Sequence, residues 1–177
     1  MTLQIDYLDQ HLDAIPTLAR WHQAEWAGVT PQLSVDDRIA GFRDRARRGV
    51  VPTGFVAILD ANVVGLACLV ENDAESHQHL SPWLASVLVS PEHRGHGIGS
   101  ALSERATQEA RILGFSKLYL FTFNKQRFYA RLGWSHVEKA SYAGVPGTIM
   151  EQTLVSCSDN KTFRDCSVRI ERRHYNR

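Results

Sequence analysis

The stretch Arg94-Gly95-His96-Gly97-Ile98-Gly99 decides the fold that this sequence predicts. It lies between an apolar run, residues 83–89, and residues 98–113, where apolar side chains recur at helical spacing. A glycine-rich turn between a strand and a helix leaves backbone N–H groups unpaired, with the positive end of the helix dipole behind them. The sequence therefore predicts a cradle for phosphate at this turn.

Spacing argues against two common nucleotide-binding patterns. In G-x-G-x-x-G counted from Gly95, the third glycine would stand at Ser100, and residues 117–123 offer no acidic side chain for a ribose. The P-loop requires Gly-Lys-Ser/Thr before its helix, whereas Gly97 and Gly99 are followed by isoleucine and serine. An ordinary tight turn between strand and helix is the plain alternative.

The pattern R-x-x-G-x-G, at Arg94, Gly97 and Gly99, resembles the acyl-coenzyme A pyrophosphate loop of the GNAT N-acetyltransferase superfamily. Upstream, residues 84–93 resemble the family's fourth strand, and downstream residues 128–134 resemble its F-Y-x-x-x-G-F/W signature. The order and separation of these blocks match from about residue 3 to residue 154. The resemblance implies an α/β (α+β) fold with a mixed, mainly antiparallel sheet, whose central strands splay apart and are flanked by helices.

The same resemblance implies acetyl-CoA as co-substrate, with no metal, and a pantetheine arm that bonds to exposed strand backbone. The implied coenzyme contacts are strand residues Val87, Leu88 and Val89 and loop residues Arg94, Gly95, His96, Gly97, Ile98, Gly99 and Ser100. Many members carry asparagine and alanine where this chain has Thr122 and Lys125. Either Asn124 takes the asparagine's role from a shifted position or that coenzyme contact is absent, so these contacts stay unassigned.

Two residues are the catalytic candidates. The family signature places its proton donor at Tyr129, and a phenol can protonate a departing thiolate; local packing beneath a short helix is the alternative. Glu71, at the end of the third strand, is the candidate base, with Asp73 and Glu75 as rivals. An exposed acidic loop, or a water chain in place of one base, is equally open.

The acceptor is expected to be a cationic amine, because the loop after residue 70 is acidic. Trp26, Trp83 and Asp73 are the predicted acceptor contacts, with core packing as the alternative for the tryptophans. His93 and His96 flank the glycines, and no cysteine or carboxylate completes a metal shell at familiar spacing. No metal site is predicted.

Composition fits one domain of residues 1–154 followed by a basic extension, residues 155–177. The chain has 177 residues, 44% of them hydrophobic, and a formal net charge of +1, so charge gives no reason to expect nucleic acid or membrane as partner. Three cysteines resemble neither a disulfide framework nor a zinc site, which favours a reducing, cytoplasmic setting. The extension is either a docking arm or a solvated tail.

Periodicity and turn residues predict the order of elements. Strands are expected at residues 3–8, 54–59, 62–70, 83–89, 117–123, 135–142 and 148–154, and helices at 11–26, 34–48, 98–113 and 125–132. Turns are expected at Asp60-Ala61 and at residues 144–147. The order of these elements predicts helices packed on a mixed sheet.

These observations together predict an N-acetyltransferase that transfers an acetyl group from acetyl-CoA to a primary amine of a small molecule or peptide. Transfer is expected to be direct, inside a ternary complex. The alternative from another class is a catalytically silent acyl-CoA-binding regulatory module. The sequence does not determine the oligomeric state; exchange of the final hairpin and edge pairing between subunits are the two routes by which a homodimer could form.

Overall fold

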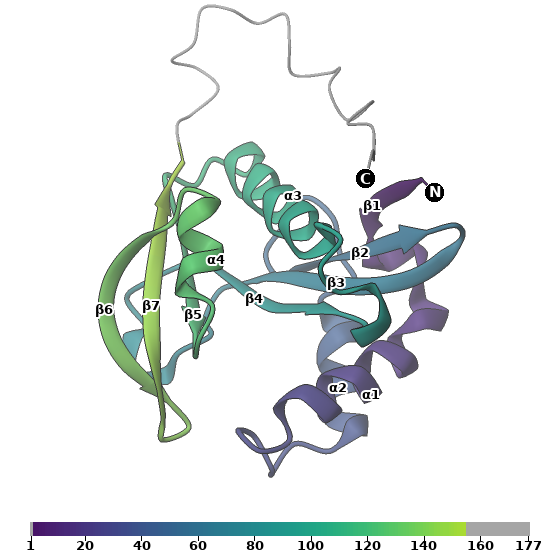
Figure 1. Ribbon diagram of the computed structural model, residues 1–177, viewed down its shortest axis with the longest axis horizontal. Coiled ribbons are helices and arrows are strands. Elements are labelled where there is room, and N and C mark those ends of the chain that lie inside the picture. Colours follow the sequence, from purple (N-terminus) through teal and green to yellow (C-terminus); the bar gives the residue numbers. More distant parts are fainter. Residues whose placement is uncertain (1, 155–177) are drawn as a thin grey trace, which may run out of the picture.

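A seven-stranded sheet organises residues 2–154, the part of the chain that the computed structural model describes (Figure 1). The strands are β1 (Leu3–Tyr7), β2 (Thr53–Leu59), β3 (Asn62–Val70), β4 (Trp83–Val89), β5 (Lys117–Thr122), β6 (Ser135–Tyr142) and β7 (Val145–Thr153). Their order is β1-β2-β3-β4-β5-β7-β6, and every neighbouring pair is antiparallel except β4 and β5. The predicted mixed, mainly antiparallel sheet is confirmed.

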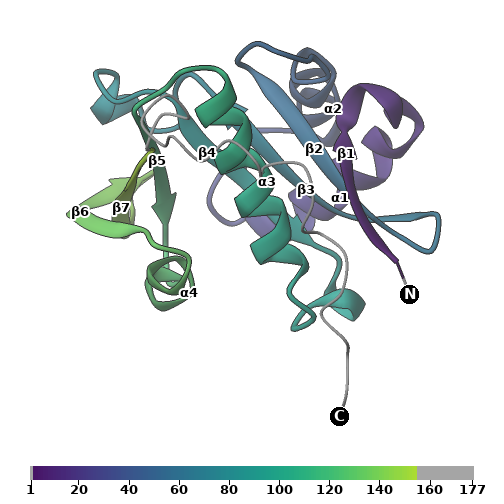
Figure 2. The same ribbon diagram turned by 90° about the horizontal axis from the view of Figure 1, so that it is seen from above.

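Four α-helices cover the two faces of the sheet. They are α1 (Ile15–Trp26), α2 (Val35–Asp44), α3 (Ile98–Ile112) and α4 (Gln126–Arg131), with short 3-10 helices at Leu8–Gln10, Leu12–Ala14, Glu75–His77 and Pro91–His93. Helices α1 and α2 lie on one face, and α3 crosses the other (Figure 2). The extension 155–177, with Cys157 and Cys166, lies outside the described residues.

Most predicted elements stand within a few residues of their observed bounds, and three of them differ. The first helix begins at Ile15 with Pro16 in its first turn, where a missing N–H is tolerated. Helix α2 ends at Asp44, short of the predicted residue 48. The last turn is Ala143-Gly144 rather than residues 144–147, because both residues have positive φ (48° and 79°), which suits a two-residue hairpin turn.

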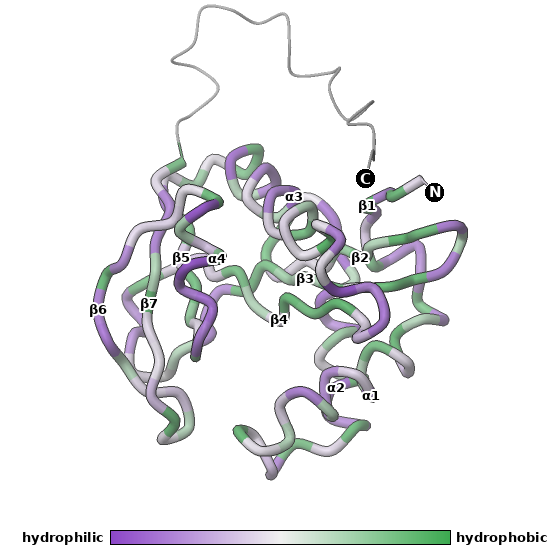
Figure 3. The backbone as a smooth tube through the Cα atoms, in the orientation of Figure 1, coloured by the Kyte–Doolittle hydropathy of each residue, from purple (hydrophilic) through white to green (hydrophobic). Residues whose placement is uncertain are grey.

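Each face of the sheet buries its own apolar cluster. Helix α3 turns Ile98, Leu102, Ala106 and Ala110, spaced by one turn, onto β2 to β5. On the opposite face, α1 and α2 pack a second cluster against the same strands. The strands at the centre are accordingly hydrophobic, whereas β6 and the loop between β4 and α3 are largely polar (Figure 3).

The central strands β4 and β5 are joined at one end only. Within residues 2–154, Trp83 and Tyr119 are the one Cα pair in their register, and the Tyr119 N–H donates to the Pro82 carbonyl at 3.0 Å. Beyond that point the two strands diverge (Figure 1), and β5 pairs along its whole length with β7 instead. The predicted splay of the central strands is confirmed.

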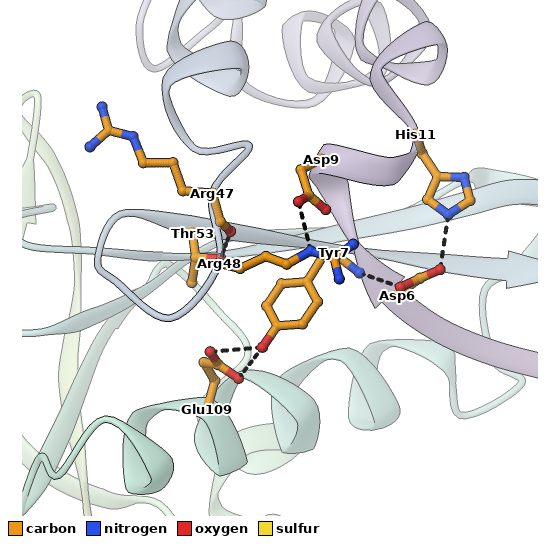
Figure 4. A network of polar contacts seen from close by, with 8 residues as sticks. All are labelled: Asp6, Tyr7, Asp9, His11, Arg47, Arg48, Thr53 and Glu109. Atoms are coloured by element: carbon orange, nitrogen blue, oxygen red, sulfur yellow. Dashed lines mark hydrogen bonds and ion pairs between the residues drawn. The ribbon is translucent and has the colours of Figure 1, made fainter.

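A buried carboxylate links α3 to the edge strand β1 (Figure 4). The Tyr7 hydroxyl lies 2.8 Å and 2.9 Å from the two Glu109 oxygens, and Glu109 is 1% exposed. Arg105 donates to Glu109 at 2.8 Å and covers the Tyr7 ring with its guanidinium. Because a buried carboxylate needs such partners, this network fixes the position of α3 on the sheet.

The sheet ends in β6, whose side chains are mostly exposed. A homodimer through this edge stays a prediction. In the part of the chain from residue 2 to residue 154, no helix combines the length and apolarity that a bilayer crossing needs.

We expect Tyr7→Phe to lower the free energy of unfolding by about 1–3 kcal/mol, because the Glu109 carboxylate then loses one hydrogen bond in a buried setting. Urea denaturation followed by circular dichroism measures the change. Tyr119→Phe is the matched control, since the Tyr119 hydroxyl makes no hydrogen bond to residues 2–154. Equal losses in the two variants would contradict a stabilising role for the Tyr7–Glu109 contact.

Candidate active site

The loop between β4 and α3 has the backbone geometry of an anion cradle. Gly95 and Gly97 have φ of +82° and +79°, a region that side chains with Cβ rarely adopt, and both face open space. Gly97 caps α3 with no side-chain hydrogen bond. The first N–H groups of this 15-residue helix therefore have no acceptor within the helix and carry the positive end of its dipole. The glycine-rich turn between a strand and a helix, which comprises Gly95 to Ser100, stands where the sequence predicted it.

Arg94 braces this loop. Its Nε donates to the Val89 carbonyl at 3.0 Å, and its Nη2 lies 2.8 Å from the Glu25 carboxylate on α1. The neighbouring histidines make local bonds, His93 to the Ser90 hydroxyl at 2.7 Å and His96 to the His93 carbonyl. Among residues 2–154, no group of three or more metal-ligating side chains gathers at one point.

A bulge in β4 turns the strand away from β5. Leu66 faces Leu88 and Cys68 faces Ala85, so two residues of β4, Ser86 and Val87, stand opposite a single residue of β3. Ser86 has φ +55°, a left-handed conformation that costs about 1–3 kcal/mol in a residue other than glycine. The bulge leaves the backbone that follows it, up to Val89, without a strand partner on the β5 side within residues 2–154.

The bulge borders a cavity of about 450 Å³, a size typical of small-ligand sites. Its walls come from α1, α2, β4 and the segment from β5 to α4. Among the residues predicted from sequence, Val87, Tyr129, Trp26 and Asp73 line this cavity. Glu25 also lines it and bonds to Arg94, so the cavity and the glycine loop are adjacent.

Two residues predicted from the sequence do not fit this geometry, and the structure corrects them. Trp83 is fully buried, with its Nε1 donating to the Leu80 carbonyl at 2.7 Å, and it packs in the core because β4 is covered on both faces. Glu71 is exposed in the bend after β3 and does not line the cavity. Trp83 as an acceptor contact and Glu71 as a base are therefore not supported.

Tyr129 occupies one wall of the cavity as a buried phenol. The residue is 8% exposed and packs edge-on against Phe128 and Trp134. Burial raises the pKa of Tyr129 to about 12, and its hydroxyl has no hydrogen-bond partner within residues 2–154. The phenol is thus fully protonated at neutral pH and keeps its proton available to a ligand in the cavity.

Asp73, rather than Glu71, is the carboxylate that the loop after β3 contributes to the cavity. Burial raises the pKa of Asp73 to about 6, with Arg45 opposing the shift. A carboxylate with a pKa in this range is ionised near neutral pH but is a better proton acceptor than an ordinary aspartate. Asp73 is therefore the carboxylate at the cavity whose protonation changes closest to neutral pH.

A polar cluster at the floor of the cavity was not predicted from the sequence. It is formed by His22, Arg38, Arg45 and Ser86. Arg38 donates to Nδ1 of His22 at 2.8 Å, and Nε2 of His22 lies 3.2 Å from the Ser86 hydroxyl. Burial and the two arginines lower the pKa of His22 to about 3. The imidazole is therefore neutral, accepts at Nδ1 and donates at Nε2 to the strained bulge residue.

A signal for this cluster was present in the sequence. Arg38, Phe42 and Arg45 recur at helical spacing, which puts all three on one face of α2 and its last turn. Phe42 is 2% exposed, so this face is directed inward and carries both arginines with it. Polar residues on the apolar face of a helix are candidates for a functional site.

Thr122 and Lys125, the two departures from the family pattern, also lie at the cavity. The Lys125 N–H donates to the Thr122 hydroxyl at 3.0 Å at the start of α4. Both residues line the cavity together with Asn124. The threonine thus stabilises the turn between β5 and α4 that carries Tyr129 to the cavity wall.

A comparison with protein families gives the class of this protein. A model described as the Acetyltransferase (GNAT) family matches residues 15–134, which include the parted strands, the glycine loop and Tyr129. The protein is therefore an acyltransferase. The chain belongs to the Acetyltransferase (GNAT) family.

A curated relative matches over a short segment. The chain is 38% identical over 55 residues to an amino-acid acetyltransferase from Mycobacterium tuberculosis (strain ATCC 25618 / H37Rv). The match covers 31% of this chain and 31% of that protein. The aligned segment thus spans about a third of the curated relative it matches.

Two solved structures share the fold. One is yncA from Salmonella typhimurium with its cofactor acetyl-CoA, with a TM-score of 0.67, 17% identity, and coverage of 88% of this chain and 96% of that one. The other is N-acetylglutamate synthase from Neisseria gonorrhoeae complexed with coenzyme A and N-acetyl-glutamate, with a TM-score of 0.62, 19% identity, and coverage of 88% and 36%. At this identity, both likenesses establish the architecture.

Proposed function

We propose that this protein transfers an acetyl group from acetyl-CoA to a primary amine of a small molecule or peptide, directly within a ternary complex. One observation carries the proposal: a buried phenol and a carboxylate of raised pKa line the same cavity, next to the glycine loop. The Salmonella neighbour contains acetyl-CoA, and the mycobacterial relative is an amino-acid acetyltransferase, which both support the assignment.

The coenzyme is proposed to bind along the opening between β4 and α3. Backbone N–H groups from Gly95 to Ser100 would hold its diphosphate against the helix dipole. The backbone of Val87, Leu88 and Val89, which has no strand partner on the β5 side within residues 2–154, would pair with the pantetheine arm as an additional strand would. This arrangement directs the thioester toward the bulge and the cavity.

Transfer requires a neutral amine, a stabilised oxyanion and a proton for the thiolate. In the proposed step, the amine nitrogen bonds to the acetyl carbon, and a backbone N–H near Val87 donates to the oxyanion that forms. The C–S bond then breaks, and Tyr129 gives its proton to the departing sulfur. Asp73 accepts the proton that the amine loses, directly or through water.

The alternative of a catalytically silent acyl-CoA-binding module predicts binding without turnover. A cavity of about 450 Å³ beside the coenzyme loop, with an acid and a base at its walls, favours the enzyme. Thiol release from acetyl-CoA, measured with a panel of primary amines, tests the proposal. Tight coenzyme binding with no thiol release across a broad panel would favour the silent module.

Gly97→Glu is expected to weaken acetyl-CoA binding at least about tenfold, because it adds a negative side chain at the diphosphate site and strains a residue at φ +79°. Isothermal titration calorimetry measures the change. Gly114→Glu is the matched control, since Gly114 also has positive φ and open space but follows the other end of α3. Unchanged binding in Gly97→Glu would place the diphosphate elsewhere.

Tyr129→Phe is expected to lower kcat about tenfold or more while the KM for acetyl-CoA changes little, because it removes the proton donor and leaves the ring packing. Steady-state thiol release measures both constants. Tyr119→Phe, outside the cavity, serves as the control for loss of a phenol. An unaltered kcat in Tyr129→Phe would exclude Tyr129 as the general acid.

Asp73 gives the reaction a pH dependence. Because the base must be ionised, kcat/KM should rise with pH through an inflection near pH 6, and Asp73→Asn should remove the inflection and lower kcat/KM about 100-fold. The folded state holds the Asp73 proton more tightly than the unfolded chain does, whose pKa is 3.8. The resulting contribution to the free energy of unfolding is fully present below pH 3.8 and is lost as pH rises through about 6. At pH 8 the buried Asp73 is ionised and destabilises the fold, whereas asparagine carries no charge. We therefore expect the Asp73→Asn variant to be folded at pH 8.

The comparison with Glu71→Gln decides between the two carboxylates. Glu71 is two residues away in sequence, exposed, and outside the cavity. Its replacement should leave the inflection near pH 6 in place. An inflection that disappears in Glu71→Gln and survives in Asp73→Asn would reverse the assignment.

A further inference from the structure

The floor of the cavity holds two guanidinium groups that have no carboxylate within ion-pair distance. Arg38 and Arg45 lie about two turns apart on the inward face of α2 and its last turn. Within residues 2–154, neither makes an ion pair, and their hydrogen bonds go to neutral acceptors. Asp73 attracts Arg45 and Asp37 attracts Arg38 through space, but neither guanidinium has a hydrogen-bonded carboxylate, so a bound anion would add a direct ion pair.

The two arginines differ in how many donors they retain. Arg38 is 5% exposed and uses its Nε and both terminal nitrogens on three neutral side chains, so it is a fixed positive charge. Arg45 donates to the Ser86 hydroxyl at 3.2 Å and lies beside the neutral Cys68 thiol. Because a guanidinium has five N–H donors, Arg45 keeps several of them for a ligand.

The remaining charges around the cavity do not neutralise this floor. Glu25 is paired with Arg94 at 2.8 Å, and Asp37 accepts hydrogen bonds in the N-terminal cap of α2 at 2.6 Å and 2.8 Å. Lys125 adds a cation, and Asp37 and Asp73 are the two lining carboxylates, among the described residues, that stand outside an ion pair. The wall formed by Arg38 and Arg45 therefore offers guanidinium groups that form no ion pair within residues 2–154, a feature that the acidic loop alone did not suggest.

We propose that the acceptor is an amine that also carries a carboxylate, an amino-acid type of substrate, and that Arg45 binds this carboxylate with Arg38 as supporting charge. The proposal rests on the acetyl transfer proposed above. A guanidinium fork matches a carboxylate in two parallel hydrogen bonds. Because Arg45 also bonds to Ser86 at the bulge, a carboxylate held there brings the amine of the same molecule close to the bulge and to Asp73.

The test compares each of the common amino acids with its own carboxamide, which keeps the amine and side chain but loses the negative charge. Thiol release from acetyl-CoA gives kcat and KM for both members of each pair. At least one amino acid should exceed its carboxamide by about tenfold or more in kcat/KM, mainly through KM, as a charge-assisted pair predicts. The amine of the carboxamide is less basic, so a larger fraction of it is neutral and able to react at the assay pH. This effect favours the carboxamide, and a preference for the amino acid therefore reports binding of the carboxylate.

Variants assign the effect to the arginine. Arg45→Gln should lower kcat/KM for the preferred amino acid about tenfold or more and change that for its carboxamide less than about threefold. Arg43→Gln, an exposed arginine of the same helix, should change neither. Arg38→Gln is expected to act like Arg45→Gln where its circular dichroism and melting temperature match the wild type.

Several results would overturn the inference. One is an equal or better kcat/KM for carboxamides or polyamines. Another is an equal loss for acid and amide in Arg45→Gln. A third is a raised KM for acetyl-CoA in that variant, which would assign the arginines to a coenzyme phosphate. All three leave acetyl transfer intact, whereas no thiol release with any amine would overturn the proposed function and this inference with it.

Discussion

The parting of two neighbouring strands is the constraint on which the rest of this structure depends. A central strand normally satisfies its backbone on both sides, but β4 has no register partner on the β5 side after Trp83, and Ser86 and Val87 form a bulge further along the strand. The strained conformation of Ser86 is held by hydrogen bonds from His22 and Arg45. The polar cluster at the cavity floor is therefore connected to the unpaired edge of β4 through the hydrogen bonds to Ser86.

Local chemistry dictates the features that could be predicted from the sequence. The apolar run of β4 and the glycines before α3 were found at the right positions, because buried strands and positive φ each demand particular residue types. Two-sided burial of Trp83 depends on helices far away in the chain. The sequence around Trp83 is the same whether the indole is buried in the core or exposed in a pocket, so it does not distinguish the two.

The cavity chemistry was the harder part to predict. Asp73 and Glu71 are two residues apart in one acidic loop, and only the path of the chain after β3 directs one inward and leaves the other in solvent. The bulge falls at a serine, which carries no signal for positive φ. Arg38 and Arg45 had a readable spacing, but a charged helix face is usually solvated, so only the tertiary structure shows that both line the cavity and that Arg38 is buried.

The single register pair between Trp83 and Tyr119 also divides the sheet into two leaves, β1 to β4 and β5 to β7. Within residues 2–154, no further ladder hydrogen bond ties one leaf to the other beyond this junction. What joins the leaves elsewhere is side-chain packing and side-chain hydrogen bonds, such as the contact of His77 with Glu138 at 3.2 Å. The width of the opening between β4 and β5 is therefore set by contacts between side chains, whereas each leaf is held internally by its own backbone ladders.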